Sequence, residues 1–288
     1  MRAPAGPPQL LYLPDGGDVA LEGAPEQRLL PGPWRSGSRR CPPEMVDVRG
    51  QFCIDRFEVS LADRTTGREL SPYYHPTSAQ VRRCYAGWQT RRLNSGTQQA
   101  RSVPVPEPPP WQLEGPFTPS ARSVPGAVPS GYLSGRTAEE ACRNAGKRLC
   151  LLDEWRTACR GQRARKFPYG DQYEPGTCNV ARDVHPARLL HGNASINHLD
   201  PRLNLVEHGG EPLLRKTGAT SSCRSEWGDD ALFDMVGNLD EWVEDPEGTF
   251  AGGFYSRGTQ EGCDAAIMSH DFAYFDYSLG TRCCRSMP

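Results

Sequence analysis

The sequence of 288 residues has no long hydrophobic run and almost no net charge. No stretch approaches the roughly 20 apolar residues that a membrane-spanning helix needs, and residues 1–8, MRAPAGPP, lack the apolar core of a signal peptide. Lys and Arg number 33 and Asp and Glu 35, a net charge of −2. Such a balance does not attract nucleic acid or an anionic membrane. The sequence therefore predicts a soluble protein without a transmembrane segment, a visible signal peptide or a nucleic-acid partner.

Several motifs of enzymes and metal sites are also missing from the sequence. It contains no Gly-x-Ser-x-Gly turn of serine hydrolases and no phosphate-binding glycine loop. The cysteine spacings do not repeat in the close pairs of a zinc site, and no two of the six histidines form a His-x3-His pair. His191, His198 and Asp200 are close enough in sequence to suggest a metal or acid–base cluster, but no motif fixes their geometry. Histidines in surface loops are the simpler interpretation.

The 11 cysteines are the most unusual part of the composition. So many thiols in a soluble domain usually form disulfides in an oxidising compartment. We therefore expect an extracytoplasmic protein, whether periplasmic, surface-bound or secreted. This expectation disagrees with the missing signal peptide, and a misplaced start codon or export together with another protein would reconcile the two. Because the number of cysteines is odd, at least one is free or pairs between chains.

The chain is expected to form one folded domain preceded by an arm. Residues 1–44 are rich in Pro, Gly and Arg and lack periodicity, which is typical of an extended arm or linker. The folded domain spans residues 45–288, and its first segments, 45–48 and 52–59, alternate apolar and polar residues as half-buried strands do. A proline-rich insertion at about residues 95–131 is expected to lie on the surface, without a helix or an inner strand.

Two short helices are predicted in the middle of the domain. Thr137 and Glu140 have the spacing of a capping box, apolar residues follow at helical intervals, and Gly146 can supply a left-handed stop. A second helix is expected over residues 153–160, ended by Gly161. The remaining predictions are loops over residues 162–224 and short strands near residues 238–243, 249–255 and 280–284. With 30 glycines and 27 prolines, the chain is expected to adopt an irregular α+β fold.

Four blocks of sequence occur in a fixed order that is found in a known family. Residues 52–59, FCIDRFEV, match an entry strand, and AGKRL at 145–149 with Glu154-Trp155 is similar to a helix pair written AGKRLPTEAEW. The third block is FPYGD at 167–171 followed by Cys178-Asn179, similar to PWGD…CN. The fourth is DMVGNLDEWV at 234–243, similar to DMxGNVWEWV, followed by GGFY at 252–255 and LGTRC at 279–283 in place of GGSW and GFRC. In these blocks, which cover roughly residues 45–285, the chain resembles the formylglycine-generating enzyme (sulfatase-modifying factor) family.

The resemblance implies an irregular α+β fold of the C-type-lectin-like kind, stapled by disulfides and stabilised by calcium. Calcium prefers carboxylate and carbonyl oxygens. The ligands implied by the resemblance are the side chains of Asp234 and Glu241 with the carbonyls of Gly237 and Leu239 at one site, and Asn179 with the carbonyl of Val180 at a second. Without the resemblance, the turn at 234–241 is read equally well as a hairpin turn with solvated acids.

The resemblance also implies disulfide pairings. The family's two structural disulfides correspond to Cys142 with Cys283 and Cys159 with Cys263. A third bridge, Cys150 with Cys284, is expected because Cys150 replaces the proline of the AGKRLP motif and because adjacent cysteines bond each other only through a strained ring. The partners of the remaining cysteines stay open: Cys41, Cys53, Cys84, Cys178 and Cys223.

Enzymatic members of this family hold copper with two cysteine thiolates and oxidise a cysteine of a sulfatase to formylglycine. The family places this pair between the GGSW glycines and a structural cysteine, which corresponds here to residues 254–263. That segment contains Ser256 and Thr259, but its single cysteine, Cys263, is expected in a disulfide. Hydroxyls do not replace thiolates as ligands of copper(I).

We therefore predict a non-oxidising member of the family that acts as an extracytoplasmic binding or accessory module for a protein, peptide or glycan ligand. The aromatic residues of segment 270–277 are a candidate wall for a ligand groove. One alternative is a copper-dependent formylglycine-generating oxidase that recruits cysteines from among Cys84, Cys178 and Cys223. Another is an enzyme of a different reaction type on the same scaffold, with His270 or a carboxylate as the base.

Overall fold

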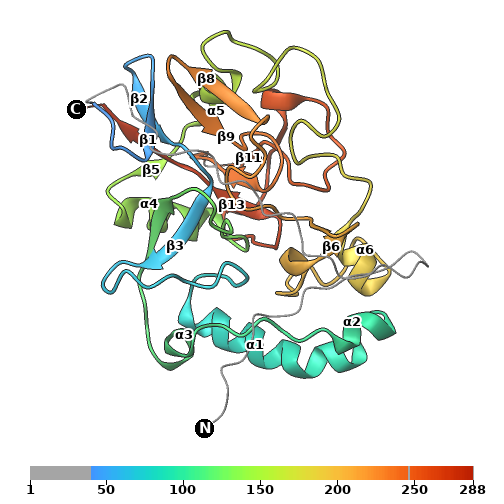
Figure 1. Cartoon of the computed structure of the whole chain (residues 1–288). Coiled ribbons are helices and arrows are strands. Elements are labelled where there is room, and N and C mark those ends of the chain that lie inside the picture. Colours follow the sequence, from blue (N-terminus) through green and yellow to red (C-terminus); the bar gives the residue numbers. More distant parts are fainter. Residues whose placement is uncertain (1–39, 246, 288) are drawn as a thin grey trace.

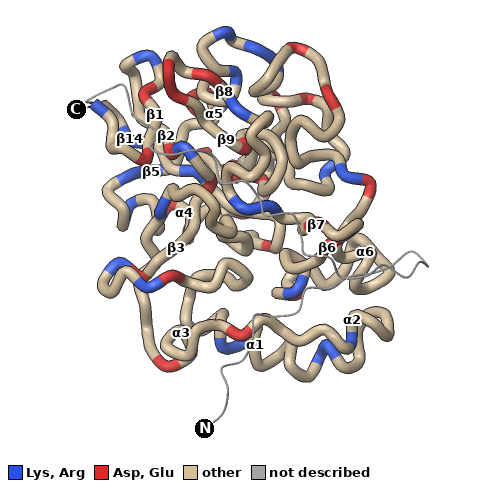
Figure 2. The backbone as a smooth tube through the Cα atoms, in the orientation of Figure 1, with Lys and Arg blue, Asp and Glu red and all other residues tan. Residues whose placement is uncertain are grey.

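The computed structural model describes residues 40–245 and 247–287, and most of the predicted arm, residues 1–39, lies outside this range. Within the described residues the strands form two four-stranded sheets and three two-stranded sheets, joined by long loops and short helices (Figure 1). No helix among these residues is long and apolar enough to cross a membrane. Basic and acidic positions are scattered among one another over the described chain (Figure 2).

The first four-stranded sheet joins the start of the described chain to its end. Its strands are β1 (Met45–Val48), β2 (Phe52–Asp55), β14 (Cys283–Ser286) and β5 (Arg148–Leu149), in that order and all antiparallel. The alternating pattern at 45–48 and 52–59 therefore marks an edge strand and a central strand of this sheet, but the central strand ends at Asp55, and the next strand begins at Val59. β14 lies between β2 and β5, so residues more than 130 positions apart in the chain become neighbours (Figure 1).

The second four-stranded sheet carries the turn at residues 234–241. Its order is β12 (Ala266–Ile267), β11 (Phe250–Ala251), β10 (Asp240–Trp242) and β13 (Leu279–Thr281), with β10 and β13 parallel. The two-stranded sheets pair β3 (Val59–Asp63) with β4 (Pro119–Ser123), β6 (Glu207–His208) with β7 (Glu211–Pro212), and β8 (Arg224–Trp227) with β9 (Asp230–Phe233).

The two predicted helices are present as α4 (Gly135–Asn144) and α5 (Leu152–Arg160). Gly146 and Gly161 follow them with positive φ angles of 71° and 66°, as their predicted role as stops requires. The predicted capping box is wrong by one turn. Ser134 is the N-cap of α4, and its hydroxyl accepts from the Thr137 N–H at 3.2 Å while the Thr137 hydroxyl accepts from the Ser134 N–H at 3.0 Å.

The region around the proline-rich insertion contains helices that the sequence did not predict. The helices outside the α4–α5 pair are α1 (Ser78–Arg91), α2 (Gln98–Ser102), α3 (Pro110–Glu114) and α6 (Pro186–His191), with 3-10 turns at Arg92–Asn94, Leu203–Leu205 and Gly262–Asp264. The expectation that the insertion at about residues 95–131 holds no helix is wrong for α2 and α3, and α6 lies in the segment 162–224 that was predicted as loops. Helix α3 begins at Pro110, where a missing N–H costs nothing and a fixed φ favours the first turn. The strand inside the insertion, β4, pairs only with β3.

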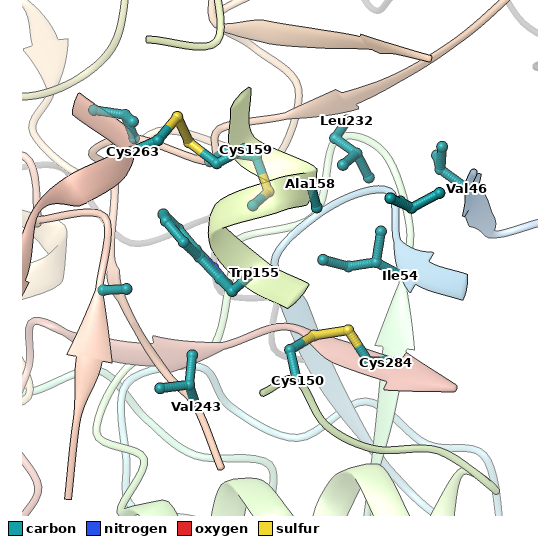
Figure 3. Packing of buried hydrophobic residues seen from close by; sticks show 14 of the residues in the cluster. Val46, Ile54, Cys150, Trp155, Ala158, Cys159, Leu232, Val243, Cys263 and Cys284 are labelled. Atoms are coloured by element: carbon teal, nitrogen blue, oxygen red, sulfur yellow. A yellow bond between two sulfur atoms is a disulfide. The ribbon is translucent and has the colours of Figure 1, made fainter. Parts of the chain in front are cut away.

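Helix α5 lies at the centre of the largest buried cluster (Figure 3). The Trp155 side chain is fully buried there, in one cluster with Ile54 of the first sheet, Ala251 of the second sheet and Val243, which follows β10. Two disulfides border the helix, Cys150–Cys284 at its start and Cys159–Cys263 at its end. Burying side chains of this size contributes about 2–3 kcal/mol each. The cluster thus fixes the position of both sheets relative to α5.

All 11 cysteines lie in the described part of the chain, and ten of them form disulfides. The bonds are Cys41–Cys53, Cys142–Cys283, Cys150–Cys284, Cys159–Cys263 and Cys178–Cys223, with Cys84 as the one free thiol. Two of them, Cys142–Cys283 and Cys159–Cys263, are the pairs that the family resemblance implied, and Cys150–Cys284 is the third bridge expected from the adjacent cysteines. Cys41–Cys53 links the first described residues to β2, and Cys178–Cys223 links two loop segments.

Candidate functional site

The segment of residues 254–263, where the family resemblance places a reactive cysteine pair, is held rigidly by backbone hydrogen bonds. It leaves β11 through Gly252 and Gly253, both with positive φ. The Tyr255 N–H donates to the Asn238 carbonyl at 3.1 Å, and the Tyr255 carbonyl accepts from the Arg182 N–H at 3.0 Å. The segment is therefore clamped between the turn at 234–241 and the loop at 178–184.

The side chains of this segment make structural contacts and offer no thiol. The Ser256 hydroxyl donates to the Val184 carbonyl at 2.6 Å, and the Thr259 hydroxyl accepts from the Glu261 N–H at 3.2 Å. Arg257 forms a 2.5 Å ion pair with the buried Asp240. The only cysteine of the segment, Cys263, is bonded to Cys159. The hydroxyls of Ser256 and Thr259 are thus engaged with the backbone, and the Tyr255 hydroxyl donates to Asn204 Oδ1 at 3.1 Å.

The single free thiol lies on a different element, helix α1. The Cys84 thiol donates to the Leu199 carbonyl at 3.5 Å. Burial raises the pKa of Cys84 to about 12, with the negative charge of Asp200 as a second cause. At neutral pH this group is a thiol and not the thiolate that binds copper(I) or attacks a substrate. Cys178 and Cys223, the other candidates for a recruited pair, are joined in a disulfide and are 3% and 0% exposed.

The turn at residues 234–241 packs directly against Asn179, so the two implied calcium sites are neighbours. Gly237 has a φ of 87°, and a Cβ at this position would lie 2.2 Å from the Asn179 carbonyl oxygen and 2.9 Å from the Val180 Cβ. The Asn238 N–H donates to the same Asn179 carbonyl at 2.8 Å, and the Asn179 amide donates to Asn238 Oδ1 at 2.9 Å. Only glycine permits this close approach of the two loops.

Buried carboxylates surround this turn and outnumber the one buried guanidinium among them. Glu241 pairs with the fully buried Arg282 at 2.9 Å and also accepts from the Trp155 indole N–H at 2.7 Å. Glu58 accepts from the Asn238 amide and from the Leu239 N–H. Asp234 accepts from the Gly218 N–H at 2.6 Å. Three carboxylates and one guanidinium leave this interior with a negative excess when all are ionised.

The electrostatic consequence is a pair of carboxyl groups that resist ionisation. Burial is the main reason that the pKa of Asp234 rises to about 7. Burial also raises the pKa of Glu58 well above its ordinary value, and the charges of Asp234 and Glu241 raise it further. In such an interior, either protons or a cation must offset the excess negative charge.

The implied calcium ligands are oxygen atoms, which suit a hard cation, but some of these oxygens already accept hydrogen bonds from protein groups. The Asn179 Oδ1 atom is buried and has no hydrogen-bond partner among the described residues, which is what a ligand oxygen facing a cation shows. Both oxygens of Glu241, in contrast, are bonded to Arg282 or Trp155. No group of three or more His, Cys, Asp or Glu side chains in residues 40–245 and 247–287 is arranged to hold a metal ion. A bound calcium would therefore depend on carbonyl and amide oxygens as well as on Asp234.

A cavity of about 370 Å³ lies beside the clamped segment. Its floor is the loop at 178–184, whose other edge carries the hydrogen bonds to Tyr255 and Arg257. Its lining includes Tyr173, Pro175, Cys178, Arg182, His208 and Arg215. One loop, residues 178–184, therefore both lines the cavity and is hydrogen-bonded to the segment where the family has its reactive pair.

The other candidate groups of the sequence are separated by the fold. His191 and Asp200 do meet, at 2.9 Å, but both are fully buried and Arg202 also pairs with Asp200 at 2.7 Å. His198 instead contacts the Ala194 carbonyl at 2.7 Å. His270 lines a wide surface hollow and stacks on Phe250. These contacts are those of structural histidines.

The aromatic segment 270–277 does not form one wall of a groove. Tyr277 is buried and its hydroxyl contacts His185 at 3.0 Å, whereas Tyr274 is partly exposed. Phe272 packs on Gly135 of α4, and Phe275 lines a separate cavity beside α1. The rings thus point to different parts of the molecule.

Sequence reasoning missed the residues that organise the interior of the site. Glu58 and Arg282 stand inside the FCIDRFEV and LGTRC blocks, and a charged residue inside an apolar strand pattern was the available signal. Arg182 and Arg215 stand in loops without a periodic pattern, so nothing in the sequence indicated that they face one cavity.

Comparison with known proteins agrees with this arrangement. The model of the sulfatase-modifying factor enzyme 1-like domain matches residues 8–283. The chain belongs to this family. The match begins inside the segment predicted as an arm and includes the turn at 234–241, the segment at 254–263 and the loop at 178–184. The fold is accordingly the irregular, disulfide-stapled α+β fold that the sequence blocks implied for this family. No curated protein matches the sequence.

Solved structures with a similar fold are distant in sequence. CarF is 15% identical, over 82% of this chain and 87% of its own, with a TM-score of 0.38. The Major Tropism Determinant I1 variant is 15% identical, over 88% of this chain and 55% of its own, with a TM-score of 0.41. PvdO from Pseudomonas aeruginosa is 16% identical, over 58% of this chain and 64% of its own, with a TM-score of 0.31.

Proposed function

We propose that this chain is a non-oxidising sulfatase-modifying-factor-like domain that acts outside the cytosol as a binding or accessory module. The observation that carries the proposal is the state of the cysteines. Ten of the 11 are in disulfides, and the remaining thiol, Cys84, lies on α1 with a raised pKa. Copper(I) held by protein thiolates needs two of them close together. The described chain, which contains every cysteine, offers one.

The extracytoplasmic location is proposed for the same reason. Five disulfides persist in an oxidising compartment and are rare in a reducing one. Four of the five pairs are almost completely buried, including Cys142–Cys283 and Cys150–Cys284 at 0% exposure. Such bonds serve as staples of a loop-rich fold.

Counting free thiols tests the observation on which the proposal rests, the presence of a single free cysteine. The protein purified from an oxidising compartment is denatured, alkylated and analysed by mass spectrometry, before and after reduction. We expect one alkylated cysteine, Cys84, before reduction and 11 after it. The Cys84→Ser variant should carry none before reduction. Two or more alkylated cysteines in the native protein, with one of them at Cys178 or Cys223, would replace the proposal with the oxidase alternative.

The oxidase alternative has one observation in its favour. Cys178 lines the cavity beside residues 254–263, so reduction of its bond to Cys223 would release a thiol at that cavity. A copper-dependent formylglycine-generating oxidase built in this way would need the Cys178–Cys223 bond to be reduced during its cycle. The burial of both cysteines within the main cluster opposes access to that bond.

We also propose calcium as a structural ion at the turn of residues 234–241 and Asn179. Asp234, Asn179 and the carbonyls of Gly237, Leu239 and Val180 would hold it, and the ion would offset the buried negative charge. A ligand that binds the native state alone raises stability by mass action, so a chelator should lower the melting temperature and added calcium should restore it. Asp234→Asn should remove this response, whereas Asp264→Asn, at an exposed ion pair with Arg160, should keep it. A melting curve that the chelator does not change would contradict the calcium proposal.

A further inference from the structure

We propose that the cavity beside residues 254–263 binds a carboxylate of a peptide ligand between Arg182 and Arg215. The inference rests on the proposed binding function and names the ligand chemistry of the same site. The cavity measures about 370 Å³, which is enough for one or two residues of a peptide. Both guanidiniums belong to its lining, one from the floor loop and one from the loop that follows β7.

Arg182 forms no ion pair within the described part of the chain. Its guanidinium donates to the Pro212 carbonyl at 3.0 Å. The side chain is half-buried and lines the same cavity as Arg215, and the exposed Glu211 carboxylate offsets only part of their positive charge. Two like charges in one hollow therefore repel each other. An anion bound between the two guanidiniums would offset the cost of burying the Arg182 charge and would reduce the repulsion between Arg182 and Arg215.

Arg215 is only partly neutralised. It pairs with Glu211 at 3.0 Å, but the Glu211 side chain is more than half exposed, where ion pairs contribute little. A second nitrogen of the guanidinium donates to the Thr220 hydroxyl at 3.2 Å. The one acidic residue in the lining, Asp183, is exposed at the rim. The lining itself holds two guanidiniums and one carboxylate, and Glu211, which lies outside the lining and is mostly exposed, offsets part of the Arg215 charge. The two guanidiniums can therefore still accept a carboxylate between them.

The shape and the remaining polar groups favour a peptide as the carrier of this carboxylate. The planar guanidinium fork binds carboxylates through paired hydrogen bonds. Tyr173 and Pro175 give the cavity an apolar wall against which a side chain can pack. On the opposite side, His208 Nδ1 is buried without a hydrogen-bond partner among the described residues, and a peptide backbone offers both a donor and an acceptor to such an atom.

The test is a fluorescence polarisation titration of the full chain with three labelled, alanine-based pentapeptides. The first has a central Glu and an amidated C-terminus, the second a central Gln and a free C-terminal carboxylate, and the third a central Gln and an amidated C-terminus. We expect the first or the second to bind and the third not to bind. Which of the two binds tells whether the carboxylate comes from a side chain or from the chain end.

Variants assign the binding to the two arginines. Arg182→Gln and Arg215→Gln should each weaken binding about tenfold or more, because each removes a charged hydrogen bond to the ligand. The matched control is Arg163→Gln, an exposed arginine that lies outside the lining and should change binding less than about twofold. Circular dichroism shows whether each variant is folded, and the salt dependence of binding to the unmodified chain provides a readout without mutation, since salt should weaken it.

Three outcomes would overturn the proposal. They are equal binding of the neutral peptide, an equal loss in the Arg163→Gln control, and competition by glucuronate at lower concentration than by the acidic peptide, which would point to a glycan. None of these outcomes depends on formylglycine formation. If no peptide binds and no aldehyde forms, the carboxylate proposal fails while the non-oxidising function stands.

Discussion

At the scale of single residues, buried charges and buried polar groups define this protein more than its apolar core does. Arg282 is the clearest case. It is fully buried, pairs with Glu241, and donates to the carbonyls of Asp55 and Phe233 at 2.8 Å each. One side chain thus connects β2, β9 and β10.

Replacing Arg282 should destabilise the fold strongly. Arg282→Met leaves Glu241 as an unpaired buried charge, which typically costs about 3–5 kcal/mol. Urea unfolding followed by fluorescence measures the loss. The control Arg285→Met, at an exposed position three residues further on in β14, should change the free energy of unfolding by less than about 0.5 kcal/mol. A loss below about 1 kcal/mol for Arg282→Met would contradict the assigned role.

His75 should make the protein sensitive to mild acid. Burial lowers the pKa of His75 to about 4, whereas an unfolded histidine titrates near 6.5. Between these values the unfolded state binds a proton that the folded state does not, so stability falls as the pH drops from about 6.5 toward 4. The slope contributed by this group reaches about 1.4 kcal/mol per pH unit.

Urea titrations at a series of pH values test this prediction. His75→Gln should reduce the acid-dependent loss of stability, while Gln80→Ala, which alters the same cavity beside α1 without a titratable group, should keep it. An unchanged acid dependence in His75→Gln would show that other groups cause it.

At the scale of elements, the sequence predicted the helices and strands that are marked by a recognisable residue pattern, such as a glycine after a helix or apolar–polar alternation in a strand. Gly146 and Gly161 stop α4 and α5, and the alternation at 45–48 and 52–55 marks β1 and β2. Helix α1 was missed because it buries only Val81 and Trp88 and contains Gly87 in its interior. The available signal was Thr77 as N-cap with Val81 and Trp88 seven residues apart on one face.

The sequence identified the segments that make up the candidate site, but it did not predict how these segments contact one another. The blocks identified the turn at 234–241, Asn179 and the segment at 254–263. Their contacts depend on pairings between residues about 60 positions apart, such as Asn179 with Asn238, which no local pattern encodes. Arg182 and Arg215 come together in the same way, through loop packing.

The docking of segment 270–277 on α4 depends on the lack of a side chain at Gly135. A Cβ at this position would lie 2.2 Å from the Phe272 ring. Gly135→Ala should therefore destabilise the protein by about 1–3 kcal/mol, as overpacking usually does. Gly115→Ala is the control, because nothing lies within 4 Å of its Cβ position.

Thermal unfolding of these variants distinguishes steric overlap from an effect on the helix. The second change Phe272→Leu should recover part of the loss in Gly135→Ala if overlap is its cause. An equal loss of stability in both glycine variants would argue against the contact between Phe272 and α4.

At the scale of the whole molecule, disulfides connect sheets and loops that short strands alone would hold weakly. Cys142–Cys283 and Cys159–Cys263 span 141 and 104 residues of sequence. In the chain-entropy model, closing loops of about 100 residues or more contributes roughly 4–5 kcal/mol each. Reduction should therefore unfold the domain at room temperature, measured by circular dichroism, while Cys84→Ser should leave it folded. A reduced protein with an unchanged spectrum would contradict the role of the staples.

The central claim is that this member of the family does not oxidise a cysteine to formylglycine. The most direct measurement incubates the purified protein with copper(I), oxygen and a sulfatase-type cysteine peptide, and follows the peptide by mass spectrometry with a trap for aldehydes. We expect the peptide cysteine to stay unmodified, because the segment at 254–263 offers the hydroxyls of Ser256 and Thr259 and no thiolate pair. Appearance of the aldehyde in proportion to enzyme, and its loss in Cys178→Ser or Cys223→Ser, would contradict the claim and establish the oxidase alternative.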